Sequence, residues 1–245
     1  MNPLLGLAQR AIKAKIPLPG SGLVAKYEEG ALLIRLLERL DTNCVLDVGA
    51  NKGQYAQKLR RMGYRNHIVS FEPVPQDYAI LEKAAARDPK WHLFNVALGS
   101  AEESRSFNVI GPTGVTVLSS FLEPMRDRMP KEVDSIPVQV RRLDAMMPQV
   151  DALCEGARGL FLKMDTQGFD LEVCRGSSDV MARVAGLQSE ISVQPLYEGQ
   201  PHFTKALDYY EGLGFALMNL ALVSRTPVGG ILEYDCLMAR PANLA

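Results

Sequence analysis

The chain has 245 residues, of which 47% are hydrophobic and 22% are charged, and its formal net charge is −1. A chain of this length and composition can form one α/β domain with a large core. Because it carries no surplus of basic residues, the composition argues against nucleic acid as a partner.

The first segment, "MNPLLGLAQRAIKAKIPLPGSG", places apolar residues at helical spacing among Arg10, Lys13 and Lys15. It is too short and too charged to cross a bilayer, and it lacks the pattern of a signal peptide. Two interpretations stay open. Residues 1–20 form a cap helix that packs on the domain or on a second subunit, as in a homodimer, or they lie on a membrane surface.

From about residue 27 onward, helical and strand-like patterns alternate along the chain. Helices are predicted over 27–40, 53–62, 76–87 and 203–213. Strands are predicted over 44–49, 67–72, 91–97, 104–110, 136–142, 159–165, 184–193, 215–222 and 231–239. The alternation predicts a doubly wound, mostly parallel α/β sheet, and the short link "SRTPVGG" between the last two strands predicts an antiparallel edge hairpin.

The cysteines and two of the three histidines are interpreted as structural. The four cysteines lie far apart, with neither a CxxC pair nor the spacing of metal ligands, which predicts reduced thiols and a cytoplasmic location. His67 and His92 begin strands at the end of the sheet opposite the predicted ligand site. These residues are therefore expected to pack rather than to bind.

The stretch "VLDVGANKGQYA", residues 45–56, is a strand that turns through Gly49 and Gly53 into a helix. Such a turn typically holds a nucleotide-like ligand, but the spacing of a P-loop is absent and the dinucleotide pattern GxGxxG is one glycine short. Asp47 at the strand end would repel a pyrophosphate and attract an ammonium group. S-adenosylmethionine carries an ammonium and no phosphate, and the glycines would let the backbone approach it.

The next strand ends at Glu72, 23 residues after Gly49, where a carboxylate can accept hydrogen bonds from both ribose hydroxyls. The end of the third strand, at Asn95 and Ala97, is expected to face the adenine. Because NAD sites share the acidic residue, an NAD-dependent oxidoreductase stays open as an alternative, as does a non-catalytic module that binds S-adenosylmethionine.

The motifs "VLDVGANKGQYA", "FEP", "NVALG", a Ser-Ser pair and "LKMDTQGFDLEVCRG" follow in this order. Over roughly residues 43–220 the sequence thereby resembles the FkbM family of S-adenosylmethionine-dependent methyltransferases. The resemblance implies a seven-stranded methyltransferase sheet and methylation of a hydroxyl on a saccharide, glycolipid or polyketide-type acceptor. The first 40 residues match no part of the family. We expect two parts, a helical cap over 1–40 and a catalytic domain over 41–245.

By position, the resemblance assigns the cofactor contacts to Asp47, Gly49, Asn51, Gly53, Glu72, Pro73, Asn95 and Ala97. One departure is visible. Where the family often has Val-Glu-Gly after the aspartate of the fourth strand, this chain has Thr166-Gln167-Gly168, so one local carboxylate is missing.

Methylation of an alcohol requires a group that takes the hydroxyl proton. Three candidates follow strands or lie within them: Asp165, Glu190 and His202. If Asp165 and Glu190 lie side by side, they would either raise the pKa of one carboxyl group or bind a divalent cation such as magnesium. Both interpretations stay open.

Two segments are candidates for the acceptor site. Residues 111–135 are too long for an ordinary connection and are predicted to form a lid or acceptor-binding loop, with Ser119 and Ser120 as hydroxyl contacts. In the second segment, "SVQPLYEGQPHF", the side chains of Gln194, Tyr197 and His202 could hydrogen-bond a sugar. We expect a cytoplasmic enzyme that acts on a small molecule, a sugar or a glycolipid, the last in association with a membrane.

Overall fold

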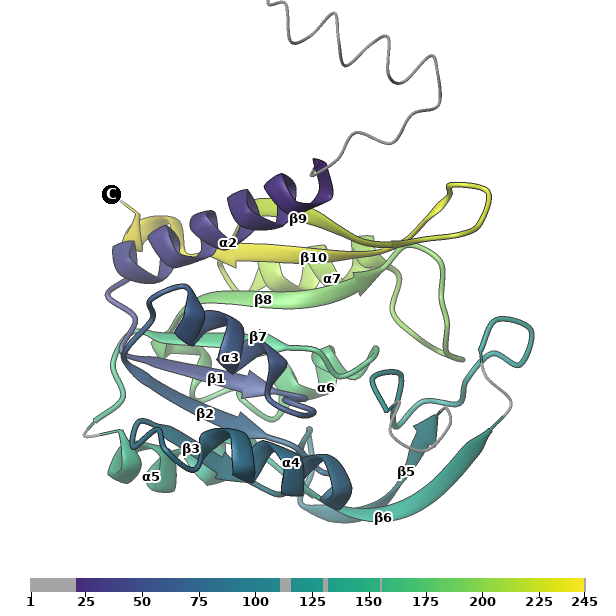
Figure 1. Cartoon of the computed structure of the whole chain (residues 1–245), viewed down its shortest axis with the longest axis horizontal. Helices are drawn as coiled ribbons and strands as arrows, with labels where there is room; N and C mark the ends of the chain where they lie inside the picture. The colour runs from purple at the N-terminus through teal and green to yellow at the C-terminus, as the bar shows by residue number, and fades with distance from the viewer. Residues whose placement is uncertain (1–20, 111–115, 130–131, 155, 245) are drawn as a thin grey trace, which may run out of the picture.

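The computed structural model describes residues 21–110, 116–129, 132–154 and 156–244, with side chains from residue 28 onward. Its centre is a seven-stranded sheet with the strand order β3-β2-β1-β7-β8-β10-β9 (Figure 1). The strands are β1 (Cys44–Val48), β2 (His67–Phe71), β3 (Trp91–Phe94), β7 (Leu160–Met164), β8 (Val184–Ser192), β9 (Ala216–Arg225) and β10 (Ile231–Ala239).

The five strands from β3 to β8 are parallel, and β10 runs antiparallel to both of its neighbours. The predicted doubly wound sheet with an antiparallel edge hairpin is therefore confirmed. The central pairing joins β1 to β7 with Cys44 opposite Leu160, so that Asp165 follows β7 beside the turn that follows β1.

Helices cover both faces of the sheet (Figure 1). One core packs α2 (Ser21–Arg39), α3 (Gln54–Arg61) and α4 (Pro75–Ala85) against the sheet, and the other packs α5 (Leu143–Leu153), α6 (Asp170–Arg175) and α7 (Phe203–Gly212) against its opposite face. Two short 3-10 helices span Met181–Arg183 and Pro241–Asn243. The sequence analysis assigned no helix to α5 or α6.

The predicted helix 27–40 forms as α2, which begins earlier, at Ser21, and ends one residue sooner, at Arg39. Its Leu33, Leu36 and Leu37 are buried in the same core as α3 and α4. Residues 1–20, to which the sequence analysis assigned a cap or a membrane contact, lie outside the described residues. The boundary between a cap and a catalytic domain stays a prediction.

A second, three-stranded sheet of β4 (Ala97–Leu98), β6 (Val133–Arg141) and β5 (Glu103–Ile110) stands beside the first. The prediction of one strand over 91–97 is wrong, because the chain leaves the main sheet after Phe94. There Asn95 Nδ2 donates hydrogen bonds to the carbonyl oxygens of Glu72 (2.8 Å) and Pro73 (3.2 Å), and Ala97 then pairs with β6. The strands predicted over 104–110 and 136–142 form, but in this second sheet.

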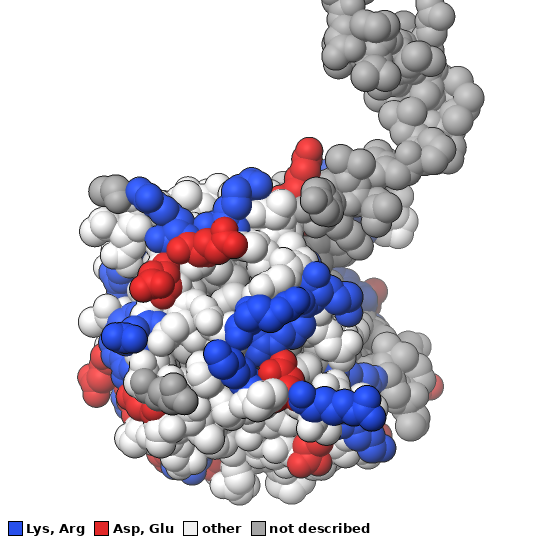
Figure 2. Space-filling model, turned by 60° about the vertical axis from the view of Figure 1, so that its left-hand side comes forward, with Lys and Arg blue, Asp and Glu red and all other residues white. Residues whose placement is uncertain are grey.

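The surface combines mixed charge with an apolar edge strand. On the face drawn in Figure 2, Lys and Arg side chains gather near the centre and acidic side chains lie among and around them. The edge strand β9 exposes large apolar side chains: Leu217, Met218, Leu220, Leu222 and Val223. Among the helices that the structure describes, none is long and apolar enough to cross a membrane.

Candidate functional site

The turn between β1 and α3 has a left-handed backbone at three positions: Gly49 (φ 74°), Asn51 (φ 49°) and Gly53 (φ 84°). A Cβ atom on Gly49 would lie 2.1 Å from the carbonyl oxygen of Asp165. Glycine is therefore required here for two reasons, the dihedral angle and the close approach of the segment that follows β7. The same absence of a side chain leaves the backbone of the turn open toward the cavity.

A cavity of about 360 Å³ opens at the carboxyl ends of β1, β2 and β7, where the ligands of doubly wound sheets bind. The main sheet and its turns contribute Gly49, Asn51, Glu72, Pro73, Asp165, Gln188 and Asp235 to its lining. The segment after β5 contributes Thr116, Val117, Ser119 and Phe121. The cavity therefore lies between the main sheet and part of the segment predicted as a lid. Residues 111–115 and 130–131 of that segment lie outside the described residues.

Glu72 is 4% exposed, and each of its carboxyl oxygens accepts a backbone hydrogen bond at the cavity wall. Oε2 accepts from the N–H of Asn51 (2.7 Å) and Oε1 from the N–H of Val74 (2.8 Å). Burial raises the pKa of Glu72 to about 7, although these two hydrogen bonds oppose the shift. The carboxyl group is thus held rigidly and has lone pairs left for two neighbouring hydroxyl groups.

The wall next to Glu72 is apolar. Phe71, Val74, Ala97, Leu98 and Phe107 line the cavity there. A flat heteroaromatic ring fits between such side chains, and the carboxyl group beside them suits the sugar attached to the ring. On this chemistry the cavity fits the adenosine part of S-adenosylmethionine. Asn95 lies outside the lining, because its amide bonds to the carbonyls of residues 72 and 73.

Asn51 links the β1 turn to the segment after β5. Its Nδ2 donates to Asp77 Oδ2 (3.2 Å) and to Thr116 Oγ1 (3.1 Å). Thr116 also donates to Asp77, which is buried. This polar cluster fixes one end of the 116–122 segment above the cavity.

Asp47 lies beneath the turn and is fully buried. Its Oδ2 accepts a hydrogen bond from Ser70 Oγ (3.0 Å), and its Oδ1 lies 3.2 Å from Lys163 Nζ. Lys163 Nζ also lies 3.5 Å from Asp165 Oδ2 and donates to the carbonyl of Gly49 (3.3 Å). Burial lowers the pKa of Lys163, but the two carboxylates outweigh it and raise the pKa overall. Asp47 thus balances the charge of Lys163, and it does not line the cavity.

A row of carboxyl groups continues from Asp165 across β8 and β10. Glu190 on β8 lies opposite Asp235 on β10, and Glu233 lies two residues before Asp235 on the same strand. Burial, followed by the charge of Asp165, raises the pKa of Asp235 to about 6. The pKa of Glu190 is also raised, by burial first and then by Asp165 and Glu233. Carboxyl groups whose pKa is raised in this way are candidates for proton transfer.

Of the three predicted catalytic residues, only Asp165 lines the main cavity. Its side chain is 40% exposed, and its Oδ1 accepts a hydrogen bond from Gln167 Nε2 (3.1 Å). Glu190 lines a small hollow beside Asp170 and Ser189. Among the described residues, Asp165 and Glu190 do not converge with a third histidine, cysteine or carboxylate at the spacing of a metal site.

His202 lies outside the cavity, contrary to the sequence-based expectation that its loop opens onto it. The residue is exposed and precedes α7 as its N-cap, and its Nδ1 lies 2.8 Å from Thr204 Oγ1. The loop follows β8 as expected, but the side chain of His202 contacts Thr204 and does not reach the cavity.

Of the predicted acceptor contacts, Ser119 lines the cavity, and its Oγ accepts the N–H of Ile110 (3.1 Å). Ser120 is fully buried and donates to the carbonyl of Gln167 (2.8 Å). Gln194 donates its amide to the carbonyl of Ile231 (2.9 Å). The polar groups of Ser120 and Gln194 are thus engaged within the protein.

Tyr197 is likewise fully buried. Its hydroxyl donates to the carbonyl of Leu118 (2.6 Å) and lies 3.0 Å from Gln167 Oε1. Together with Ser120, it ties the 116–122 segment to the loop after β7. The left-handed Gln167 (φ 53°) of that loop thus serves as a partner for both residues.

The polar cavity residues that the sequence analysis did not name include Tyr55, Gln188 and Asp235. The hydroxyl of Tyr55 donates to Gln188 Oε1 (3.0 Å), and the ammonium of Lys163 lies 5.2 Å from the centre of the Tyr55 ring. A signal for Asp235 existed, since it is a charged residue within the apolar strand "ILEYDCLMA". Nothing local marks Tyr55 and Gln188, which meet only in the folded chain.

Comparison with known proteins gives one family and one curated relative. The model of the methyltransferase FkbM domain matches residues 47–217. The 2-O-methyltransferase NoeI of Sinorhizobium fredii is 26% identical over 215 residues, covering 84% of this chain and 82% of that protein.

Two solved structures are also similar. The magnesium protoporphyrin IX methyltransferase of Synechocystis PCC 6803, with bound S-adenosylmethionine, has a TM-score of 0.49 at 10% identity, covering 89% of this chain and 80% of that one. An rRNA methylase of Streptococcus thermophilus has a TM-score of 0.44 at 12% identity, covering 84% of this chain and 91% of that one.

Proposed function

Because the chain belongs to the FkbM methyltransferase family, we propose that it transfers the methyl group of S-adenosylmethionine to a hydroxyl oxygen of a saccharide, glycolipid or polyketide-type acceptor. The family decides between the enzyme classes that the sequence left open. The chain is an S-adenosylmethionine-dependent methyltransferase, and the alternatives of an NAD-dependent oxidoreductase and of a non-catalytic module are set aside.

The cofactor would lie with its ribose against Glu72 and its adenine between the apolar side chains that line the cavity beside it. The methionine part would follow the turn at Gly49 and Asn51, which line the cavity, and Gly53 would support the turn where it packs closely against Leu81 and Trp91. When bound, this cofactor supplies an activated methyl carbon. Asp47 and Lys163 support the turn from below as a neutral ion pair.

The chain's own residues must align the acceptor and take up its proton. We propose Asp165 as the base that accepts the hydroxyl proton. Its carboxylate is partly exposed in the cavity, and the loop that carries it contacts the β1 turn at Gly49. As a general base at hydrogen-bond distance it would contribute about 10²- to 10⁴-fold to the rate. Lys163 and Gln167 fix the orientation of the carboxylate.

The acceptor would occupy the part of the cavity between Asp165 and Asp235. Gln188, Tyr55 and Asp235 present an amide, a phenol and a carboxyl group there, a set of donors and acceptors that suits a polyhydroxylated molecule. Glu190 would support this site from the adjoining hollow, and Ser119 from the 116–122 segment. The name of the relative from Sinorhizobium fredii, a 2-O-methyltransferase, supports oxygen as the methylated atom.

The observation that carries the proposal is the presence of Glu72 and Asp165 in one cavity, at the carboxyl ends of β2 and β7, the two parallel strands on either side of β1. The test incubates the protein with isotope-labelled S-adenosylmethionine and fractionated glycans, glycolipids and polyketides, and identifies the methylated product by mass spectrometry. Label on a hydroxyl oxygen is expected. Label confined to nucleic acid, protein or carboxyl groups would refute the acceptor class.

A soluble acceptor and its lipid-linked form should be compared in the same assay. Faster methylation of the lipid-linked form in vesicles than of the same molecule in detergent would support contact of the protein with a membrane surface. Equal rates on both forms would support a soluble acceptor. No magnesium site is found at the cavity among the described residues, so added magnesium is expected to leave methyl transfer unchanged.

A further inference from the structure

Two histidines and two cysteines meet at the end of the sheet opposite the cofactor cavity. Cys44 is the first residue of β1, His67 the first of β2 and His92 the second of β3. Cys154 follows α5 as its C-cap. We propose that these four side chains form a binding site for a zinc ion.

The positions of the ligand atoms support this. Nδ1 of His67 lies 3.2 Å from Nε2 of His92, the two rings are stacked, and one ring nitrogen of each histidine lies within 4.8 Å of Cys154 Sγ. Cys44 Sγ lies 3.6 Å from Cys154 Sγ. In a tetrahedral zinc site, with zinc–ligand distances of about 2.0–2.1 Å to nitrogen and 2.3 Å to sulfur, two nitrogens lie about 3.3 Å apart and two sulfurs about 3.8 Å apart.

The nitrogen pair and the sulfur pair are therefore already separated as zinc requires. The nitrogen–sulfur distances must shorten to about 3.6 Å. The larger movement falls to Cys44, whose sulfur lies outside the group of three ligand atoms within 4.8 Å of one another. The two sulfur atoms are buried, and both imidazoles are partly buried. Two thiols and two imidazoles are the soft and borderline donors that select zinc over magnesium or calcium. Zinc would displace the thiol protons of Cys44 and Cys154 to solvent, leaving both sulfurs as thiolates.

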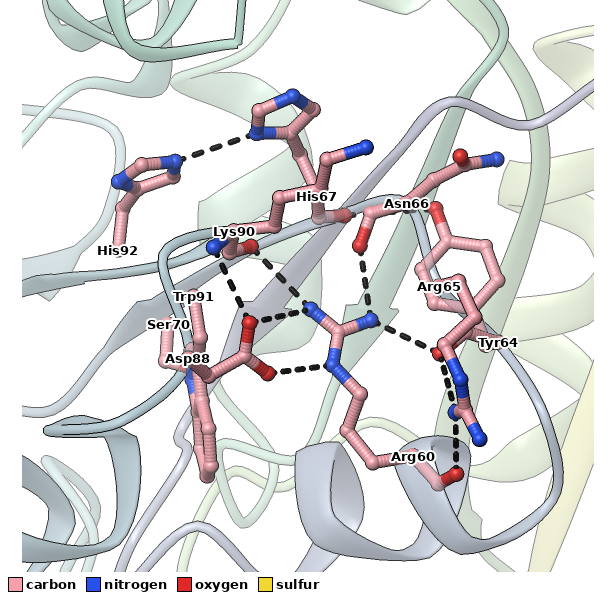
Figure 3. Close-up of polar contacts among 10 residues, drawn as sticks. All are labelled: Arg60, Tyr64, Arg65, Asn66, His67, Ser70, Asp88, Lys90, Trp91 and His92. Carbon is pink, nitrogen blue, oxygen red and sulfur yellow. Dashed lines mark hydrogen bonds and ion pairs between the residues drawn. The ribbon is translucent and has the colours of Figure 1, made fainter.

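The loops that lead to the histidines are fixed by Arg60 (Figure 3). Its Nε donates to Asp88 Oδ2 (2.6 Å), and its Nη1 donates to the carbonyl of Asn66 (2.8 Å), the residue before His67. Its Nη2 donates to the carbonyl of Lys90 (3.3 Å), two residues before His92. One guanidinium thus holds both loops, which positions the imidazoles before any ion binds.

With four protein ligands the site has no open position, which is typical of structural zinc. It would join the end of α5 to three neighbouring strands of the sheet. Sequence spacing could not reveal it, because its members lie at positions 44, 67, 92 and 154, and each comes from a different element.

The test uses the purified full chain in reducing buffer, stripped with a chelator and then titrated with zinc. We expect one zinc ion retained per chain after gel filtration, and at a hundredfold excess over the dissociation constant a melting temperature about 5–10 °C higher. Cobalt in place of zinc should give the visible bands of a tetrahedral site and a thiolate-to-cobalt charge-transfer band.

His92→Gln and Cys154→Ser should lose the zinc and the cobalt spectrum, whereas His202→Gln, at the third histidine of the chain, should retain both. Circular dichroism checks that the variants fold. If a variant fails to fold, the cobalt spectrum of the unmodified chain still decides. Absence of retained zinc and of a thiolate band in the folded chain would overturn the proposal, as would a Cys44–Cys154 disulfide under these conditions or full binding by folded His92→Gln.

Discussion

Glu72 would hold the cofactor ribose, yet its burial disfavours the ionised form of its carboxyl group. The carboxyl group has to be ionised to accept two hydroxyl hydrogen bonds, yet burial raises its pKa to about 7. Below that pH it binds a proton and gives up one acceptor. Lowering the assay pH below about 7 should therefore weaken binding of the cofactor while the protein is still folded.

We predict that the affinity of the chain for S-adenosylmethionine rises up to about tenfold between pH 6 and pH 8, since ionisation of a group with a pKa near 7 is completed over this interval. Glu72→Gln should bind about 1–3 kcal/mol more weakly and lose most of the pH dependence. Isothermal titration at several pH values measures both. The same pH dependence in wild type and variant would show that Glu72 is not its source.

A second prediction concerns Asp165 and the rate of methyl transfer. Asp165→Asn keeps the size of the side chain but removes the base, so kcat should fall by about 10²- to 10⁴-fold while the dissociation constant of the cofactor changes little. Asp208→Asn, at an exposed position of α7, is the matched control. An unchanged kcat in Asp165→Asn would transfer the role of the base to Asp235 or Glu190.

At the scale of elements, the β1 turn depends on the absence of one side chain. In Gly49→Ala a Cβ atom would lie 2.1 Å from a backbone oxygen at a φ of 74°, so the turn or the loop after β7 must move. We predict a loss of unfolding free energy of about 1–3 kcal/mol and much weaker cofactor binding. Gly212→Ala, where the added atom meets nothing within 4 Å, should leave both nearly unchanged. Thermal melts and titration test this.

The 116–122 segment is held over the cavity by side-chain hydrogen bonds and by one antiparallel bridge between Ser120 and Asn108 of β5. Tyr197→Phe would leave the carbonyl of Leu118 without its donor, at a cost of about 1–3 kcal/mol. We predict faster amide hydrogen exchange in residues 116–122 and a higher KM for the acceptor. If amide exchange becomes faster only in the loop around Tyr197 and the KM for the acceptor is unchanged, the 116–122 segment does not take part in acceptor binding.

The strands of the main sheet could be predicted from local sequence patterns, whereas contacts between distant segments could not. Apolar runs with alternating helical signals located the strands of the main sheet, and "SRTPVGG" located the edge hairpin, because each of these signals is local. The break after Phe94 was missed, since it depends on Asn95 reaching the backbone of the neighbouring strand end. The cavity was predicted at Gly49 and Glu72. Gln188 joins it only through β8, and nothing near residue 188 in the sequence announces its partner Tyr55.

For the whole molecule, the raised pKa values have a consequence for stability. A carboxyl group whose pKa is higher in the folded than in the unfolded state stabilises the fold below its unfolded pKa, and this contribution is lost as the pH rises through the folded pKa. Glu72, with a folded pKa of about 7, and Asp235, at about 6, both behave in this way. Without cofactor, both groups work against the fold above neutral pH.

We predict that the difference in unfolding free energy between Glu72→Gln and the wild type moves in favour of the variant as the pH rises from 5 to 8. The comparison cancels the other titrating groups, which both proteins share. Urea unfolding at each pH without cofactor provides the measurement. A difference that stays constant with pH would mean that Glu72 titrates at its ordinary value in the folded chain.

The order of the strands also sets the timing of assembly. The central pair, β1 and β7, is separated along the chain by the whole stretch from α3 to α5, which includes the second sheet. Contacts this distant in sequence form late, because a long loop must close before they stabilise anything. The half built from β1, β2 and β3 can gather from neighbouring segments, whereas the cofactor cavity needs β7 in place. During refolding, secondary structure should therefore return well before the ability to bind S-adenosylmethionine.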